Sequence, residues 1–196
     1  MPEKNPDSRR LIIFFGMIAA GKSFLAKEWA YRNQCPYHNS DVIRKELAGC
    51  SQNSRQTFAI NRGIYSPEYT KKTYDELINR AEKGLQSTVS GCAVLDGSYK
   101  NSSDRQSIVS SFSSKATVFF IYCSCSEATI RKRLRSRAAD PQSISDGRWE
   151  IYQQQKGSFQ IPTKIDGAHL LHIYTEKHID ELIKEVDSFI GKKISY

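Results

Sequence analysis

The chain has 196 residues, of which 39% are hydrophobic and 26% are charged. This length and composition suit one soluble α/β domain with a sizeable core, and no stretch is long enough to span a membrane. The formal net charge of +8 suits an anionic ligand such as a nucleotide, and it permits nucleic acid binding without demonstrating it.

Cysteine usage and the N-terminal segment indicate a cytoplasmic protein. The five cysteines show neither zinc-ligand spacing nor a paired framework, so we expect reduced thiols. Arg9 and Arg10, followed by an apolar run, resemble a signal peptide, but the run is short and leads directly into a Gly-Lys-Ser motif. We expect residues 1–9 to form a flexible tail and residues 10–196 to form a single domain.

The first predicted strand and helix enclose a glycine-bounded loop. Leu11–Phe15 is an apolar run of strand length, and Gly16–Ser23 follows with the pattern G-x-x-x-x-G-K-[ST]. Apolar residues then recur at helical spacing. A strand, such a loop and a helix, in this order, are the context of a P-loop, so the chain is predicted to bind a nucleoside triphosphate.

The residue types in this loop match the chemistry of phosphate binding. Gly16 and Gly21 let the backbone approach phosphate oxygens, and the loop amides point at the anion together with the helix N-terminus. Lys22 would reach the β- and γ-phosphates of ATP, and the Ser23 hydroxyl would bind Mg²⁺. The residues expected to contact the nucleotide are Gly16, Met17, Ile18, Ala19, Ala20, Gly21, Lys22, Ser23 and Phe24.

A carboxylate follows the second predicted strand. This strand covers residues 36–39, and a helix then begins near Asp41 and ends before Gly49. Ser40 or Asp41 could be simply an N-cap of that helix. Because a cap and a functional carboxylate are compatible, Asp41 is a candidate site residue.

A second carboxylate ends the third predicted strand. Ser66–Glu68 begins a helix that is predicted to run to about Ser90, and Cys92–Asp96 is then a buried strand. In doubly wound α/β folds the carboxyl end of a strand faces the ligand crevice. Asp96 could therefore hold the water shell of Mg²⁺ or a substrate hydroxyl, although an acid at this place can also simply begin a turn.

The next helices carry basic residues. A predicted helix over residues 101–112 has Arg105 in its first turn, against the helix dipole, so Arg105 could bind a carboxylate or a phosphate. Residues 117–123 form the fourth strand. A helix beginning at Ser126 then carries five cations. They form either a solvated helix face or part of a lid that closes on phosphates, and this lid would cover about residues 126–150. The five cations are Arg131, Lys132, Arg133, Arg135 and Arg137.

The C-terminal elements complete an α/β pattern. Residues 146–155 predict a short helix, residues 170–174 a fifth strand, and residues 179–190 a last amphipathic helix. This alternation predicts a P-loop NTPase fold, with a five-stranded parallel sheet flanked by helices and a helical lid. The four histidines have no metal-ligand spacing.

Several motifs, in this order, resemble a family of predicted P-loop kinases with an AAA-type ATP-binding domain. Its members occur alone or fused to aminoglycoside-phosphotransferase-like domains, and the wider group includes the 5′-kinase domain of phage polynucleotide kinase, zeta toxins and gluconate-kinase-like enzymes. The resemblance covers about residues 10–160 and implies ATP- and Mg²⁺-dependent phosphoryl transfer to a hydroxyl. The motifs are the P-loop, residues 39–49, 65–68 and 74–77, Val94–Tyr99 followed by Arg105, Arg133 and Leu134 with Arg137, and Ser145-Asp146.

The resemblance also implies roles for single residues. Asp41 and Arg44 stand at the Asp-x-x-Arg positions that supply the base for the acceptor hydroxyl in polynucleotide kinases. Asp96 matches the aspartate that places the acceptor or, through water, the metal. Arg137, with Arg133 as its neighbour, matches the lid arginine that stabilises the phosphoryl charge. The implied catalytic residues are Lys22, Asp41, Arg133 and Arg137, and the implied substrate-binding residues are Asp41, Arg44, Asp96 and Arg105.

The loop centre departs from the family. Met17–Ala20 replaces the usual filling of proline, glycine and serine, and Phe24 replaces the threonine that usually follows Ser23. Ala19 and Ala20 are small enough to keep the backbone close to phosphate. Neither change removes a ligand-bearing group, so we expect nucleotide binding to be intact and turnover to be less well determined.

Two other functions also fit the sequence. One is a nucleotide-binding regulatory or ATPase module without a phosphoryl acceptor, although no guanine-reading N/TKxD element supports a GTPase switch. The other is a kinase of nucleic-acid 5′ ends, which the basic balance fits. The expected partners are a nucleotide and a small-molecule hydroxyl acceptor in a pocket lined by residues 41–75 and 96–105. The acceptor and the oligomeric state are not determined by the sequence.

Overall fold

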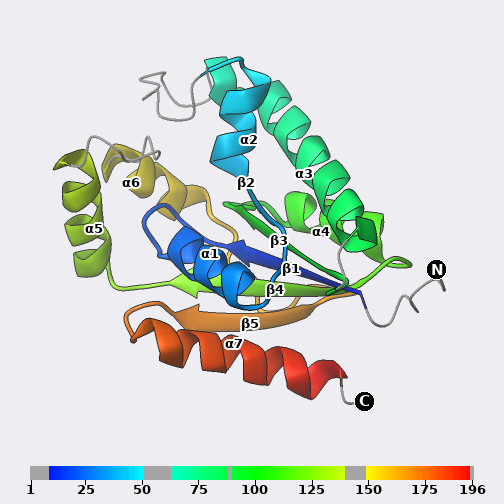
Figure 1. The fold of residues 1–196 in the computed structure, drawn as a ribbon. Coiled ribbons are helices and arrows are strands. Elements are labelled where there is room, and N and C mark those ends of the chain that lie inside the picture. Colours follow the sequence, from blue (N-terminus) through cyan, green and yellow to red (C-terminus); the bar gives the residue numbers. More distant parts are fainter. Residues whose placement is uncertain (1–8, 51–62, 88–89, 140–148, 195–196) are drawn as a thin grey trace.

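The protein forms a sheet covered by helices on both faces (Figure 1). The computed structural model describes residues 9–50, 63–87, 90–139 and 149–194. Its five strands lie in the order β2-β3-β1-β4-β5, and all neighbouring strands are parallel. The predicted five-stranded parallel sheet is therefore confirmed. The strands are β1 (Arg10–Phe15), β2 (Tyr37–Asn39), β3 (Cys92–Gly97), β4 (Thr117–Ser124) and β5 (His169–Tyr174).

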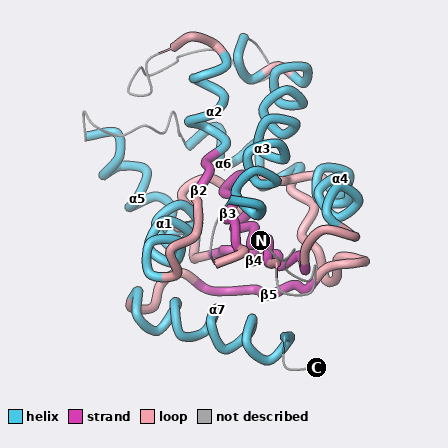
Figure 2. The backbone as a smooth tube through the Cα atoms, turned by 45° about the vertical axis from the view of Figure 1, so that its right-hand side comes forward, coloured by secondary structure: helices cyan, strands magenta, loops and turns pink. Residues whose placement is uncertain are grey.

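The helices form two layers because the strands are apolar on both sides. The side chains of β1 alternate between the two faces, so that Ile13 and Phe15 pack with α3 and α4 whereas Ile12 and Phe14 pack with α1 and α7. Figure 2 shows α7 on one side of the strands and α3 and α4 on the other. The helices are α1 (Lys22–Arg32), α2 (Ser40–Leu47), α3 (Pro67–Ser87), α4 (Ser102–Phe112), α5 (Glu127–Ala139), α6 (Trp149–Ser158) and α7 (Ile179–Ile194), with a 3₁₀ turn η2 (Gly63–Tyr65). None of the helices in the described part of the chain combines the length and the apolar character needed to cross a bilayer.

Helix starts follow the predicted chemistry. The Ser66 hydroxyl accepts a hydrogen bond from the Tyr69 amide at 3.3 Å, directly before α3. At α4, Asn101 and Asp104 form a reciprocal capping box. Helix α3 ends at Ser87, a few residues before the predicted end near Ser90.

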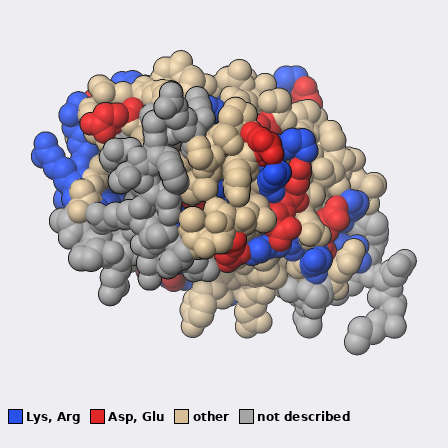
Figure 3. All heavy atoms as spheres, turned by 90° about the horizontal axis from the view of Figure 1, so that it is seen from above, with Lys and Arg blue, Asp and Glu red and all other residues tan. Residues whose placement is uncertain are grey.

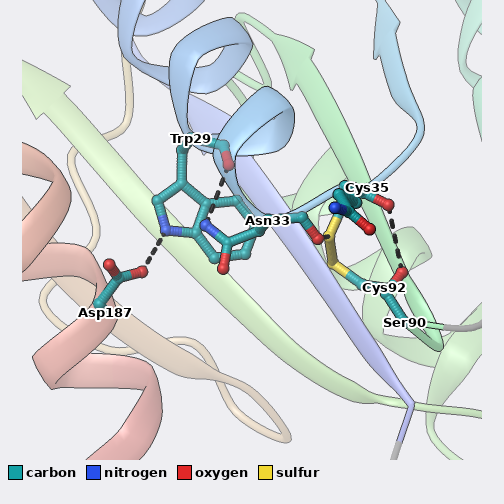
Figure 4. Close-up of a disulfide and its surroundings, with 7 residues drawn as sticks. Trp29, Asn33, Cys35, Ser90, Cys92 and Asp187 are labelled. Carbon is teal, nitrogen blue, oxygen red and sulfur yellow. Dashed lines mark hydrogen bonds between the residues drawn. A yellow bond between two sulfur atoms is a disulfide. The ribbon is translucent and has the colours of Figure 1, made fainter.

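A disulfide joins Cys35 to Cys92, so the prediction that all cysteines are reduced is wrong for this pair (Figure 4). Cys35 lies two residues before β2 and Cys92 begins β3, and the amino ends of neighbouring parallel strands meet at one edge of the sheet. Their Cα atoms are 5.4 Å apart although 57 residues separate them in sequence. Sequence spacing could not reveal the pair, because the pairing of β2 with β3 creates it.

A polar contact fastens the two helices of one face to each other. The Trp29 indole of α1 donates to Asp187 of α7 at 2.8 Å, and the Asn33 amide group donates to the Trp29 carbonyl at 3.0 Å (Figure 4). Trp29 is 1% exposed, so its ring contributes to the core while its N–H keeps a partner. These contacts fix the helix that begins in the glycine-bounded loop.

Candidate active site

The loop between β1 and α1 has the backbone geometry that its glycines allow. Gly16 and Gly21 have φ angles of +146° and +88°, which residues with a side chain rarely adopt. A Cβ atom at Gly16 would lie 2.4 Å from the Cys123 carbonyl oxygen, so the loop also needs glycine for space. Ala19 has a φ of +59°, which bends the loop centre without glycine.

The loop ends at the N-terminus of α1, where free amides favour an anion. Gly21 is the residue before the helix and Lys22 is its first residue, so the amides of Lys22, Ser23 and Phe24 have no partner within the helix. The Lys22 ammonium lies 3.5 Å from the Met17 carbonyl oxygen and therefore curls over the loop. Phe24 points outward, with 67% of its surface exposed.

Asp96 is the most strongly organised carboxylate of this region. It is fully buried at the carboxyl end of β3, beside Phe14 of β1 and Asn39 of β2. Its Oδ2 atom accepts hydrogen bonds from the Tyr37 hydroxyl, at 2.6 Å, and from the Asn39 side chain. Burial, with the charge of Asp96, raises the pKa of Tyr37 and keeps its hydroxyl protonated as a donor.

The second oxygen of Asp96 accepts no hydrogen bond within the described part of the chain. Oδ1 is buried and has no hydrogen-bond partner among those residues. An unsatisfied buried carboxylate oxygen is costly, which suits a ligand, a water or a metal-bound water at this point. Burial raises the pKa of the nearby Cys123 thiol, and the charges of Lys22 and Asp96 both act on it. Lys22 and Asp96 therefore share one end of the sheet.

Asp41 is not the cap of its helix. The N-cap of α2 is Asn39, whose Oδ1 atom accepts from the Asp41 amide at 2.9 Å and from the Val42 amide at 3.1 Å. The alternative that Ser40 or Asp41 serves as the N-cap is thus wrong. Asn39 also donates to Asp96, so one side chain orders both carboxylate-bearing segments. The half-buried Asp41 carboxylate is left for another role.

Arg137 is a half-buried cation of α5 on which the charges of both carboxylates act. Burial, followed by the charge of Arg133, lowers the pKa of Arg137, while the charges of Asp41 and Asp96 raise it. Arg137 thus lies within electrostatic range of both acids. Part of the predicted lid over residues 126–150 lies outside the described residues, but α5 is described and brings this guanidinium to the site.

Arg133 lies one helical turn earlier and contacts the P-loop backbone. Its Nη1 atom is 3.2 Å from the Ala19 carbonyl oxygen, and its Nη2 atom donates to the Thr175 carbonyl oxygen at 2.7 Å. The other cations of the helix face solvent, and Figure 3 shows Lys and Arg side chains gathered at the end of the molecule that α5 forms. The exposed cations are Arg131, Lys132 and Arg135.

The two remaining arginines of the predicted site bind main-chain carbonyl groups. Arg44 donates to the Ile64 carbonyl oxygen at 2.8 Å, and its Nε atom is buried without a partner among the described residues. Arg105, which is 3% exposed, donates to the Tyr99 carbonyl oxygen at 2.7 Å. Burial lowers the pKa of Arg105. Arg44 and Arg105 therefore bind the main chain of the segments around Ile64 and Tyr99, and they order these segments.

A groove of about 480 Å³ opens between α3 and α4. Tyr74 lines it and also contacts the end of β3, since its ring stacks on Tyr99 at 4.7 Å and its hydroxyl accepts from the Tyr99 amide at 3.2 Å. The groove thus adjoins the strand end that carries Asp96. Its other polar lining residues include Thr70, Lys71, Asp75, Lys100, Asn101, Ser103, Asp104 and Ser107.

The donor set fits Mg²⁺ held mainly by phosphates and water. No group of three or more His, Cys, Asp or Glu side chains forms a metal cage within the described residues. A P-loop serine and a carboxylate with a vacant oxygen are instead the oxygen ligands that such an ion takes beside a nucleotide. Ser23 at the start of α1 and Oδ1 of Asp96 are of these two types.

Sequence reasoning missed four residues that organise the site. Tyr37 and Asn39 hold Asp96, while Thr175 and Gln155 hold the loop backbone from distant segments. A signal existed only for Asn39, which stands directly before a predicted helix and could have been recognised as its N-cap. The other three are ordinary polar residues whose partners are set by tertiary contacts.

Comparison with known proteins supports this fold. A family model described as an AAA domain matches residues 11–162. No curated protein sequence matches the chain. Among solved structures, a sugar kinase from Janibacter sp. HTCC2649 has a TM-score of 0.67 at 12% identity and covers 94% of this chain and 95% of its own.

Two further solved structures are similar over nearly the whole chain. A gluconokinase from Sinorhizobium meliloti 1021 has a TM-score of 0.64 at 14% identity, covering 96% of this chain and 95% of its own. The Mycobacterium tuberculosis APS kinase CysC, in complex with AMPPNP and APS, has a TM-score of 0.65 at 16% identity, covering 94% and 98%. At these identities the similarity establishes the fold.

Proposed function

Because this chain belongs to the AAA domain family and has the fold of P-loop kinases, we propose that it is a kinase that uses ATP and Mg²⁺. It transfers the γ-phosphoryl group to a hydroxyl of a small molecule or of a nucleic-acid 5′ end. The observation that carries this proposal is the position of Arg137. It lies within electrostatic range of Asp41 and Asp96, at the end of the sheet that also carries the P-loop.

The proposed roles follow from charge and position. The loop amides, together with Lys22, hold the β- and γ-phosphates, and Ser23 binds the metal ion. When bound, Mg²⁺ would neutralise negative charge on the phosphates. Asp41 accepts the proton of the acceptor hydroxyl, and Arg137 stabilises the charge that develops on the transferred group, with Arg133 adding positive charge beside it.

Asp96 is proposed to orient the acceptor or a metal-bound water through Oδ1. Oδ2 is already engaged by Tyr37 and Asn39, so the carboxylate cannot rotate freely and its second oxygen keeps a fixed direction. Fixed dipoles and charges are effective because they need no reorganisation during the reaction. The groove between α3 and α4 is the proposed entrance for the acceptor.

The first test is transfer of label from γ-labelled ATP, with Mg²⁺, to pooled sugars, nucleosides, antibiotics and 5′-hydroxyl oligonucleotides. We expect label on one pool, with Lys22→Ala losing most turnover. Asp41→Asn should keep nucleotide affinity and lose transfer, because it keeps the shape of the side chain and removes the base.

Two results would count against this function. Transfer retained by Asp41→Asn would remove the proposed base from the mechanism. Saturable nucleotide binding with label released only as free phosphate, in every pool, would indicate a nucleotide-binding module instead of a kinase.

A further inference from the structure

The centre of the P-loop is held from behind by side chains of three other elements. The Ile18 amide donates to Gln155 of α6 at 2.8 Å, and the Ala19 carbonyl accepts from Arg133 of α5 at 3.2 Å. The Ala20 carbonyl accepts from the Thr175 hydroxyl, directly after β5, at 2.6 Å. Three successive loop residues therefore have a main-chain group fixed by a distant side chain.

Fixing a carbonyl also fixes the amide that shares its peptide plane. In a trans peptide the C=O and N–H bonds point in nearly opposite directions. The hydroxyl of Thr175 draws the Ala20 carbonyl to one side of the loop, so the Gly21 N–H points to the other side. Gly21 directly precedes the first amides of α1, which the helix leaves without an internal partner.

Thr175 is buried, and its hydroxyl is held in position for the contact with Ala20. The residue is 5% exposed, and its hydroxyl accepts a hydrogen bond from Arg133 Nη1 at 3.0 Å while it donates to Ala20. A Cβ atom on Gly21 would lie 2.7 Å from the Thr175 hydroxyl oxygen and 2.9 Å from Arg133 Nη1. The hydroxyl and the guanidinium thus fill the space directly behind Gly21.

We propose that Thr175 is a positioning residue for nucleotide binding, which aims the Gly21 amide at the phosphates through the Ala20 carbonyl. Arg133 supports it by binding both its hydroxyl and its carbonyl. This inference rests on the proposed function, because it assumes a phosphate in the loop. It gives Arg133 a role behind the loop in addition to its charge.

The test compares two buried threonines of the same chain. Thr175→Val removes the hydroxyl that binds Ala20 and keeps the shape of the side chain. The matched control is Thr73→Val in α3, where a fully buried threonine hydroxyl donates to the Tyr69 carbonyl at 2.7 Å. Both variants lose a hydrogen bond to a main-chain carbonyl, and only one of the two carbonyls belongs to the P-loop. Thr175→Val also loses the bond that the hydroxyl accepts from Arg133.

Calorimetric titration with ADP and Mg²⁺, and thermal unfolding without nucleotide, give the two readouts. We expect Thr175→Val to weaken ADP binding about tenfold, the upper end for one neutral hydrogen bond. Thr175→Ser should restore binding because it keeps the hydroxyl, and Thr73→Val should bind as the wild type does. Both valine variants should lower the unfolding midpoint, and Thr175→Val should lower it more because it also loses the bond from Arg133. Only Thr175→Val should weaken ADP binding, which separates positioning from general stability.

Unchanged ADP affinity in Thr175→Val, or equal weakening in Thr73→Val, would overturn the positioning role. If the valine variant does not fold, Thr175→Ala tests the same loss without a branched side chain, with the same expected weakening. Wild-type protein that fails to bind ADP would overturn the proposed function itself. The two failures are therefore distinguishable.

Discussion

At the scale of single residues, the site depends on side chains that act through the main chain. Asn39 shows this clearly, because one amide group caps α2 with its oxygen and holds Asp96 with its nitrogen. Tyr37 completes the arrangement from the same strand. As a result Asp41 has no capping role, and Asp96 keeps one oxygen without a partner among the described residues.

Gly21 allows a residue-scale prediction about space in the loop. Gly21→Ala should abolish ADP binding, because the added Cβ would meet Thr175 and Arg133 at less than 3 Å in a backbone conformation with φ +88°. Gly49→Ala is the matched control, since Gly49 also has a positive φ, +65°, but its Cβ would have no neighbour within 4 Å. We expect the control to lose about 1 kcal/mol of stability and to bind ADP normally.

Calorimetric titration with ADP and chemical denaturation of both variants check this expectation. If Gly21→Ala binds ADP like the wild type, close packing behind the loop is not required for binding. If both variants lose binding equally, left-handed backbone strain rather than the lack of space explains the effect.

At the scale of elements, α5 carries cations that lie in different environments. Arg137 is half-buried and within range of two carboxylates, whereas Arg135 is exposed on the same helix. The helix is anchored by a small apolar cluster in which Ile130 and Leu134 pack with Ala19 of the P-loop and Tyr152 of α6. The P-loop and α5 therefore belong to one packed unit.

This separation predicts different effects for two substitutions on α5. Arg137→Met should lower kcat for phosphoryl transfer about a thousandfold, as expected when a cation that stabilises a transferring phosphoryl group is removed. Arg135→Met should change kcat less than about twofold, since an exposed cation contributes little. Steady-state kinetics with the acceptor found by label transfer provide the measurement. A comparable loss in both variants would show that the net charge of α5, rather than the position of Arg137, is what matters.

At the scale of the whole molecule, two half-buried histidines couple stability to pH. Burial, and then the charge of Arg80, lower the pKa of His38 below 6.5, and burial also lowers the pKa of His169. The unfolded chain thus binds more protons than the folded protein below this pH. Their contribution to stability is fully present above the unfolded pKa of about 6.5, and it is lost as the pH falls below that value through the folded pKa.

The free energy of unfolding should therefore decrease from about pH 7.5 toward pH 5. His38→Leu should flatten this dependence, because His38 has a buried Nε2 atom without a partner among the described residues. His178→Leu, at a site whose side chain is 69% exposed, should leave it unchanged. Urea denaturation at a series of pH values is the measurement. A slope that is identical in wild type and His38→Leu would contradict this account.

The sequence by itself determined the fold and the nucleotide loop, because both depend on local patterns. Apolar runs at strand length, helical periodicity and the spacing of Gly16, Gly21, Lys22 and Ser23 can be read from neighbouring residues. The carboxylates at the ends of strands were found for the same reason, since their position follows from the end of each strand. Their proposed roles remain predictions for the kinetic tests.

Only the tertiary structure decided which side chains meet. Thr175 is 155 residues from Ala20, Asn39 is 57 residues from Asp96, and Cys35 is 57 residues from Cys92. Each pair forms because parallel strands, joined by helical crossovers, bring distant segments to the same edge of the sheet. Helical spacing alone also could not decide which cations of α5 face inward, because that depends on what the helix packs against. The partner of a side chain is thus a property of the packed molecule, whereas its secondary structure is largely a property of its neighbours in sequence.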